Sequence, residues 1–585
     1  MKRILLVITS LASTLLSWAD KSGTCGENLT WTYVEETKTL TISGTGAMED
    51  YQWYREEGVS PWCDSPWFEY RDIVAHVVIK NGVTSIGNCA FESYRNLNSV
   101  ELANSVTIIG RAAFSGSTLS SITISNSVTT IGNNAFSQCK GLTSIEFPNS
   151  LTSIGERAFS GCTGLVSIGL PNSLISIGQR AFSGCTALKS VEIPNSITSI
   201  ADYIFYNCSS LSSVTIPNSV TCIGANAFNF CSSLTSVEIP SSVTEIKVGA
   251  FANCTGLVSI KIPESVTSIE VGVFYGCTSL TSIEIPNSVT KIGEMAFMCS
   301  GLTSIEIPNS VTSIAASLFQ GCSKLTTINI PGNVTCMGES AFENCTNLTS
   351  IIIPECMTSI ENRTFANCRS LKSIEIPNSV TSIGGSAFSG CSGLTSIKIS
   401  NSVTSIGESV FSGCSGLTSI EIPNSVTYIG EWAFNKCAGL TSIEFPNSVT
   451  SIGENAFSYC TGLASITIPK SVTSIGRYAF ANCKGLKDVY CYAEHVPETG
   501  NTTFWFITLE NVTLHVPASA LEAYKSTDPW SEFKNIVALT EEETRIQTPS
   551  DSPSMERGIF NLQGQRIETL QKGLNIVDGK KVWVK

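Results

Sequence analysis

The sequence predicts a curved solenoid of short stacked coils in which every coil adds one strand to a parallel sheet. Two observations predict it. A Phe recurs eighteen times between residues 91 and 480, in steps of 23 residues apart from two steps of 22. The apolar residues around each Phe also keep one spacing, so every unit has the same inward positions. A period of this length is typical of arrays whose repeats bury their core only against neighbouring repeats.

A single unit shows how a coil is expected to form. In the segment LTSIEF, which begins at Leu142, the alternation predicts a short strand with Ile145 inward and Glu146 outward. The following proline ends the strand because it cannot donate a hydrogen bond to a neighbour. Two more inward residues come next, and a short helical or 3-10 turn is then expected to bury Phe159. We expect the parallel sheet on the concave face and these turns on the convex side.

The unit resembles the BspA-like class of leucine-rich repeats, whose copies read close to C-x-x-L-x-S-I-x-I-P-x-S-V-x-x-I-G-x-x-A-F. The resemblance covers roughly residues 73–536. It implies a leucine-rich-repeat solenoid on a secreted or cell-surface protein. It further implies adhesion or binding to host or microbial surface macromolecules, since several members of the family have such roles.

The N-terminus reads as an export signal. Lys2 and Arg3 precede a short apolar run, and a small residue, Ala19, ends the segment. These are the marks of a secretory signal peptide at 1–19. The apolar run is too short to cross a bilayer, and no other stretch predicts a transmembrane segment.

The ends of the array depart from the repeat, as the ends of a solenoid must. We expect an N-terminal β cap at 20–72, containing a hairpin and a Trp-rich stretch, before about eighteen repeats at 73–488. A last coil and a C-terminal cap are expected at 489–539, and an acidic, Ser/Pro-rich linker at 540–557. Residues 558–585 alternate like short strands and resemble a reduced secretion and sorting domain; the alternative is a disordered end.

Composition argues against several function classes. The formal net charge is −13 and Lys and Arg form no cluster, so a nucleic-acid partner is not expected. The chain has three His, and no serine has a placed histidine to activate it. The glycines form no phosphate-binding loop. The sequence therefore predicts neither an enzyme nor a cofactor.

The 23 cysteines follow the repeat and not a disulfide pattern. Fifteen lie three residues after a repeat Phe, from Cys139 to Cys483, and Cys299 lies two after Phe297. We expect a ladder of buried, reduced thiols, because a small apolar side chain suits that position. Zinc is not expected, since no C-x-x-C occurs. Cys25 and Cys63 lie outside the ladder, and whether they pair is open.

The outward position between the two inward residues of each strand is the candidate binding surface. Charged residues recur there and are expected to form one column on the concave face, in which the two lysines have glutamates on either side. The charged members are Glu101, Glu146, Glu192, Glu238, Lys261, Glu284, Glu306, Glu375, Lys398, Glu421 and Glu444. The column is either a solvated face or a landing surface for a basic partner or a divalent cation. The expected function is binding of extracellular or surface proteins, and the alternative is a structural spacer without a specific ligand. The oligomeric state is left open.

Overall fold

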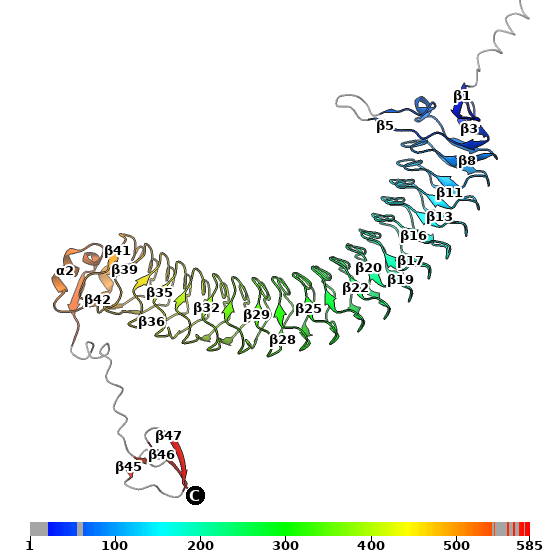
Figure 1. Cartoon of the computed structure of the whole chain (residues 1–585). Helices are drawn as coiled ribbons and strands as arrows, with labels where there is room; N and C mark the ends of the chain where they lie inside the picture. Colours follow the sequence, from blue (N-terminus) through cyan, green and yellow to red (C-terminus); the bar gives the residue numbers. More distant parts are fainter. Residues whose placement is uncertain are drawn as a thin grey trace, which may run out of the picture. The chain divides into compact units, whose positions relative to one another are not determined.

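The computed structural model describes residues 21–54, 62–540 and 543, and the backbone of four short strands between 559 and 584. The signal peptide expected at 1–19 lies outside the described residues. The chain divides into two compact units, residues 1–402 (unit 1) and 403–585 (unit 2). Stacked coils make up both units (Figure 1). The predicted solenoid is confirmed.

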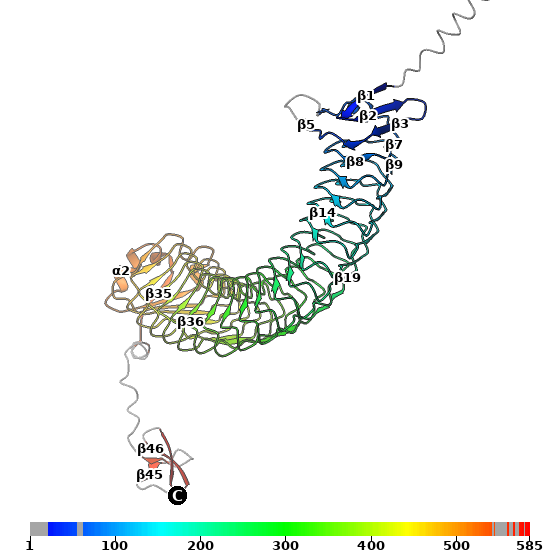
Figure 2. The ribbon, with the colours of Figure 1, turned by 45° about the vertical axis from the view of Figure 1, so that its right-hand side comes forward.

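Each coil of unit 1 has two short strands, one more than predicted. Equivalent strands of neighbouring coils pair in parallel, so Ile145 lies beside Ile122 on one side and Ile168 on the other. A single-residue bridge replaces the first strand at Glu284 and another at Ser350. Figure 2 shows the same coils from another side. Because a shift of one residue would turn the inward Ile side chains to solvent, the register is tightly specified.

The first strands of unit 1 are β7 (His76–Ile79), β9 (Ser99–Leu102), β11 (Ser121–Thr123), β13 (Ser144–Glu146), β15 (Ser167–Gly169), β17 (Ser190–Glu192), β19 (Ser213–Thr215), β21 (Ser236–Val237), β23 (Ser259–Ile260), β26 (Ser304–Glu306), β28 (Thr327–Asn329), β31 (Ser373–Glu375) and β33 (Ser396–Lys398). The second strands are β8 (Val83–Ile86), β10 (Ile108–Ile109), β12 (Thr130–Ile131), β14 (Ser153–Ile154), β16 (Ser176–Ile177), β18 (Ser199–Ile200), β20 (Cys222–Ile223), β22 (Glu245–Ile246), β24 (Ser268–Ile269), β25 (Lys291–Ile292), β27 (Ser313–Ile314), β29 (Cys336–Met337), β30 (Ser359–Ile360) and β32 (Ser382–Ile383).

The turn that carries each core Phe is not helical, and this part of the prediction is wrong. In the coil of Phe159, Arg157 and Gly161 have φ angles of 52° and 74°, and the same pair of left-handed positions recurs along the array. A right-handed helical turn cannot contain such residues. The backbone of the turn bonds to the next coil instead, as when Phe136 N–H donates to Ala158 O at 2.7 Å. The turns therefore stack almost as regularly as the strands.

The core is a file of parallel Phe rings. In unit 1 neighbouring rings, from Phe91 to Phe388, have centroids 5.2–6.1 Å apart and planes within 19° of each other. In unit 2 the file runs from Phe411 to Phe504 with centroids 5.0–5.9 Å apart. All of these rings are buried. Within the file each Phe ring contacts the Phe ring before it and the one after it, so the file is a chain of nearest-neighbour contacts.

Three small polar side chains in a coil satisfy carbonyl groups of the preceding coil. Ser150 Oγ donates to Val128 O at 2.7 Å, Thr152 Oγ1 to Thr129 O at 3.0 Å, and Cys162 Sγ to Phe136 O at 3.1 Å. Buried carbonyls need such partners. The Ser and Thr that make the sequence monotonous thus serve the stacking of the coils.

The predicted cysteine ladder is present, and all the cysteines are free thiols. The ladder thiols donate to Phe carbonyls at 3.0–3.3 Å. The prediction that Cys299 belongs to the ladder is wrong. Cys299 occupies a left-handed turn position, and Ser300 occupies the ladder position, with its Oγ 3.3 Å from Cys322 Sγ. Cys25 and Cys63 are both buried and unpaired.

An antiparallel meander precedes the first coils. It comprises β1 (Lys21–Gly26), β2 (Leu29–Val34) and β3 (Thr39–Gly44), and β3 pairs in parallel with β7. The short elements β4 (Gly46–Ala47), β5 (Trp53–Tyr54), β6 (Trp62–Cys63) and the 3-10 helix η1 (Phe68–Tyr70) follow. The buried Trp67 ring stacks on Phe91 at 5.6 Å, so it begins the file of core rings. The hairpin expected near residues 29–43 is therefore present; its role as a cap stays a prediction.

Unit 2 repeats the two-strand coil and then changes. Its second strands are β34 (Ser405–Ile406), β35 (Tyr428–Ile429), β37 (Ser451–Ile452), β39 (Ser474–Ile475) and β41 (Glu498–Thr499), and its first strands are β36 (Ser442–Glu444), β38 (Ser465–Ile468), β40 (Asp488–Cys491), β42 (Thr513–Val516) and β43 (Asn535–Ala538). The helical elements η2 (Leu509–Asn511), α2 (Leu521–Ser526) and η3 (Trp530–Glu532) lie between the last strands. Trp530 and Phe533 pack edge-on against Phe504, where the file of rings ends.

The C-terminal tail forms a small antiparallel sheet in the order β45-β44-β46-β47. Its strands are β44 (Ile559–Phe560), β45 (Arg566–Ile567), β46 (Gly573–Val577) and β47 (Lys580–Val584). In the antiparallel pair of β46 and β47, Val577 lies opposite Lys580. The tail is thus β-rich, and its role in sorting stays a prediction.

Candidate binding surface

The charged column predicted from the sequence is exposed in both units. All eleven of its residues are exposed, and the neighbouring inward positions are apolar and mostly buried. In unit 1 the parallel register brings some of them into line, as in the pairs Glu375–Lys398 and Lys261–Glu284. In unit 2 Glu444 lies on β36, whereas Glu421 lies outside the strands. The position of these residues on a concave face stays a prediction.

The two lysines of the column differ from each other. The Lys398 ammonium pairs with the Glu375 carboxylate, which raises the pKa of the lysine through a side-chain hydrogen bond and charge attraction. Lys261 forms no ion pair within 4.0 Å among the described residues. The expected charge ladder is therefore present at Lys398 and absent at Lys261. The Lys261 ammonium is left facing solvent.

A groove of about 1010 Å³ lies beside the column in unit 1. It crosses five coils at the corner where each first strand ends, and Glu192, Glu238 and Lys261 of the column line it. One wall is a series of prolines, as at Pro194 and Pro217. Asparagine side chains project at the same corners. The groove thus combines apolar walls with amide and carboxylate groups.

The charge of the groove is negative. Its ionisable lining consists of Glu192, Glu238, Glu264 and the single cation Lys261. Carboxylates in a groove attract cations more strongly than carboxylates on a flat surface. Two smaller hollows of about 330 Å³ adjoin Glu101 in the first coils. Neither crosses as many coils.

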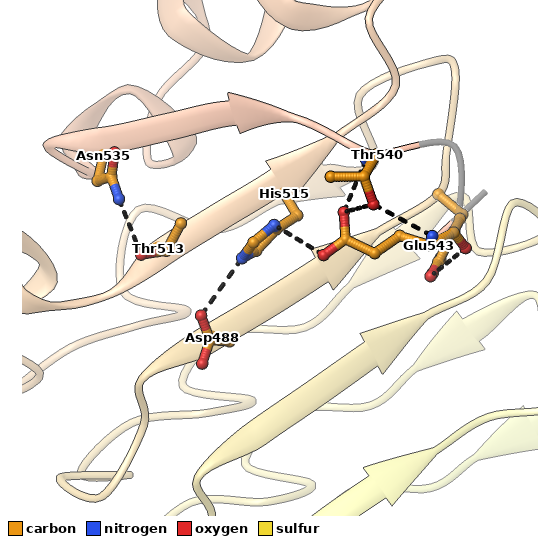
Figure 3. Close-up of polar contacts among 7 residues, drawn as sticks. Asp488, Thr513, His515, Asn535, Thr540 and Glu543 are labelled. Atoms are coloured by element: carbon orange, nitrogen blue, oxygen red, sulfur yellow. Dashed lines mark hydrogen bonds and ion pairs between the residues drawn. The ribbon is translucent and has the colours of Figure 1, made fainter. Parts of the chain in front are cut away.

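A second cluster, which the sequence did not predict, lies in the last coils of unit 2 (Figure 3). His515 projects from β42 with Nε2 3.3 Å from Asp488 Oδ1 and Nδ1 3.4 Å from Glu543 Oε1. Its ring stacks on Tyr490 with the centroids 4.3 Å apart. The backbone and hydroxyl of Thr540 donate to Glu543 Oε2 at 2.7 and 2.9 Å. The cluster fastens the start of the predicted linker to the sheet.

The pKa of Glu543 reflects its contacts with Thr540 and His515. Partial burial alone would raise it, but the hydrogen bonds from Thr540 and the charge of His515 lower it below its usual value. The ionised carboxylate is therefore favoured in the folded chain. Asp488 and His515 are 27 residues apart in the sequence and lie close together because β40 pairs in parallel with β42. Glu543 lies in a stretch that reads as linker, so no sequence signal joins the three.

The ladder thiols are buried and protonated. Burial raises the pKa of the ladder thiols, to about 12 for Cys277 and Cys460, so they stay protonated. Over the described ranges, no group of three or more His, Cys, Asp or Glu is arranged to hold a metal ion. His76, an exposed residue of β7, contacts Ser99 Oγ at 2.8 Å.

The repeat identifies the family. The profile described as "BspA type Leucine rich repeat region (6 copies)" matches residues 64–185, 129–258, 249–371, 337–464 and 405–525. The chain belongs to the BspA-type leucine-rich repeat family. The matches run through both units, so family membership applies to the array as a whole. A search of curated proteins found no match.

Several solved structures are similar to this BspA-type chain. A leucine-rich repeat protein from Bacteroides ovatus ATCC 8483 is 27% identical, covers 76% of this chain and 94% of its own, and has a TM-score of 0.44. One from Eubacterium ventriosum ATCC 27560 is 28% identical, with 64% and 95% covered and a TM-score of 0.41. A leucine rich cell surface protein from Faecalibacterium prausnitzii A2-165 is 24% identical, with 82% and 95% covered and a TM-score of 0.24. None of the helices in the described residues could span a membrane.

Proposed function

We propose that this BspA-type repeat chain is an exported, surface-presented binding protein without catalytic activity, and that it binds an extended cationic segment of an extracellular protein. The observation that carries the proposal is the groove of about 1010 Å³ beside the charged column. Its lining has three carboxylates and one lysine.

An extended segment fits this groove better than a folded surface does. The groove runs along the stacking direction, where equivalent groups repeat every coil, at roughly 4.8 Å per strand. A stretched peptide can run along the groove; its alternate side chains lie about 6.7 Å apart, so they would reach carboxylates of some coils and not of every coil. Cationic side chains would meet Glu192 and Glu238, and the asparagine amides could bond to peptide groups. Weak contacts repeated along a groove add up to useful affinity.

The test measures binding of the full chain to a labelled peptide of alternating Lys and Ala. Fluorescence anisotropy is the readout, and it is recorded at several salt concentrations. Exposed charge pairs contribute about 0.2–1 kcal/mol each, so Glu192→Gln with Glu238→Gln should weaken binding roughly three- to tenfold and reduce its salt dependence. Glu101→Gln with Glu146→Gln is the matched control, because both residues belong to the same column but lie outside the groove.

Two results would contradict the groove. One is wild-type chain that binds the Lys peptide no better than a matching Glu peptide. The other is an equal loss of binding in the control variant. Either result would favour a spacer that projects from a surface without a specific ligand. Export itself is tested by locating the full chain in the culture medium or at the cell surface, compared with a variant carrying Lys in place of Leu5 and Leu6.

A further inference from the structure

A second surface, on the Phe-bearing turns of unit 2, exposes aromatic rings. Trp432, Tyr459, Trp505 and Phe506 are 40%, 49%, 48% and 60% exposed, and Tyr478 is half-buried between them. These five residues, called the aromatic patch below, come from four successive coils. In each coil they belong to the turn and not to the first strand, so the patch is separate from the charged column. Contiguous exposed rings of this kind mark interaction sites.

The backbone gives a reason to regard the patch as functional. Trp432, Tyr459, Tyr478 and Phe506 have φ angles of 56–62°, in the left-handed region. A large side chain there costs about 1–2 kcal/mol compared with the right-handed region. The coil just before the patch has Ser409 and Gly413 at the same positions, so the fold does not require aromatic residues. Exposed rings regain little of that cost through burial, so stability does not explain them.

Four rings of the patch alternate between two positions of the turn: Trp432 and Tyr478 lie two residues before the core Phe, and Tyr459 and Phe506 lie two residues after it. Below the patch, the core rings of the same coils have centroids 5.0, 5.5 and 5.9 Å apart. On the surface Tyr478 and Trp505 have centroids 5.4 Å apart with their planes tilted by 38°, and Trp505 stacks on Phe506 at 4.6 Å. Each of the four coils thus contributes at least one ring to the patch, and such a surface suits a ligand that itself repeats. The coil-to-coil step of the core rings is close to the length of one sugar ring in a linear polysaccharide.

Polar side chains accompany the rings on the same turns. Lys436 and Arg477 are exposed, and Asn482 is half-buried at a left-handed position between two of the rings. Asn455 Nδ2 donates to Glu454 Oε1 at 3.3 Å. Among the described residues of unit 2, every strongly exposed large hydrophobic side chain is aromatic. The turns thus place flat aromatic faces beside hydrogen-bond donors.

We propose that the aromatic patch binds a linear glycan. A pyranose ring has an apolar C–H face and a rim of hydroxyl groups, so it can stack on Trp and Tyr while donors such as Arg477 and Asn482 bond to the hydroxyls. Successive sugars would stack on successive coils. This ligand and this surface are distinct from the cationic segment and the groove, so either proposal can fail without the other.

The experiment is affinity electrophoresis of the full chain in gels that contain barley β-glucan, arabinoxylan, galactomannan or hyaluronan. Isothermal titration follows with hexasaccharides of the retarding polymer. The test variant is Tyr459→Asn with Phe506→Asn, because Asn482 already occupies the equivalent position between them. The matched control is Tyr428→Ala, an exposed aromatic residue of the same unit that lies on the second strand β35.

We expect at least one polymer to retard the wild-type chain and the Tyr428→Ala chain equally. The double Asn variant should lose at least about fivefold in affinity, since each ring contact contributes modestly. Its melting temperature should be unchanged or higher, because Asn tolerates the left-handed region better than Tyr or Phe. That combination separates loss of a ligand contact from loss of folding. No retardation in any of the four gels, or unchanged retardation in the double variant, would overturn the proposal. Concentration-dependent dimerisation that only the double variant abolishes would also overturn it.

Discussion

Removing one ring from the Phe file should damage the array locally. Phe274 is fully buried, and its ring lies between Phe251 at 6.1 Å and Phe297 at 5.6 Å, nearly parallel to both. Phe274→Ala therefore removes two ring contacts and leaves a cavity that stacked coils cannot easily close. We expect a cost of about 3–5 kcal/mol in the free energy of opening the surrounding coils. That cost corresponds to a loss of roughly two to four powers of ten in amide protection.

Native-state hydrogen exchange is the assay, since a single unfolding free energy is ill-defined for a long array. The amide protons of Phe251 and Phe274, which donate to Val273 O and Ala296 O at 3.0 and 2.9 Å, should lose protection. The amide proton of Phe114, in a distant coil of the same unit, should not. Ile352→Ala is the control, because that side chain is 81% exposed and should change stability by less than about 0.5 kcal/mol. Equal loss of protection throughout unit 1 would refute nearest-neighbour coupling.

Three further predictions concern charge, thiols and pH. Glu421→Gln with Glu444→Gln should weaken any interaction with a basic partner and flatten its salt dependence without lowering the melting temperature; unchanged binding would make these residues a solvated face. Cys336, which is exposed, should react quickly with a thiol reagent, whereas Cys277 should be labelled only after unfolding, as mass spectrometry of digests would show. The lowered pKa of Glu543 means that its contribution is present above the unfolded value near 4.5 and is lost as pH falls through the folded value. The protection factor of the Leu539 amide, which corrects the exchange rate for its intrinsic pH dependence, should thus fall in acid, and Glu543→Gln should lower it already at neutral pH.

The sequence predicted the coil because its strongest signal is periodic. The recurrence of Phe and the alternation at Ile145 and Glu146 identify which side chains point inward, and the structure buries Ile145 and exposes Glu146. The helical turn was predicted wrongly because the left-handed conformation of Arg157 is imposed by hydrogen bonds to the next coil. Local propensity contains no information about such bonds. Cys299 was misplaced because spacing alone cannot show which of two neighbours, Cys299 or Ser300, keeps the ladder position.

The surfaces were harder to predict than the core. The charged column could be listed, since outward positions follow from inward ones. The groove could not, because it depends on how neighbouring corners around Pro194 and Pro217 separate in space. The aromatic patch was missed for a different reason: Tyr459 and Phe506 occupy turn positions that vary from coil to coil. The periodic signal comes only from residues that recur at the same position in every coil, so residues that differ between coils were not singled out.

The hydrogen bonds between coils bear on how such a gene can change. Ser150, Thr152 and Cys162 donate to the coil before. Carbonyls of their own coil accept from Ser173 and Cys185 of the coil after, where Ile175 replaces the threonine. An extra 23-residue coil inserted between two others would find matching partners on both sides. Near-identical repeats also favour unequal recombination between copies. Copy number is therefore free to drift within a lineage, and close relatives should differ in the number of coils more readily than in the residues that join them.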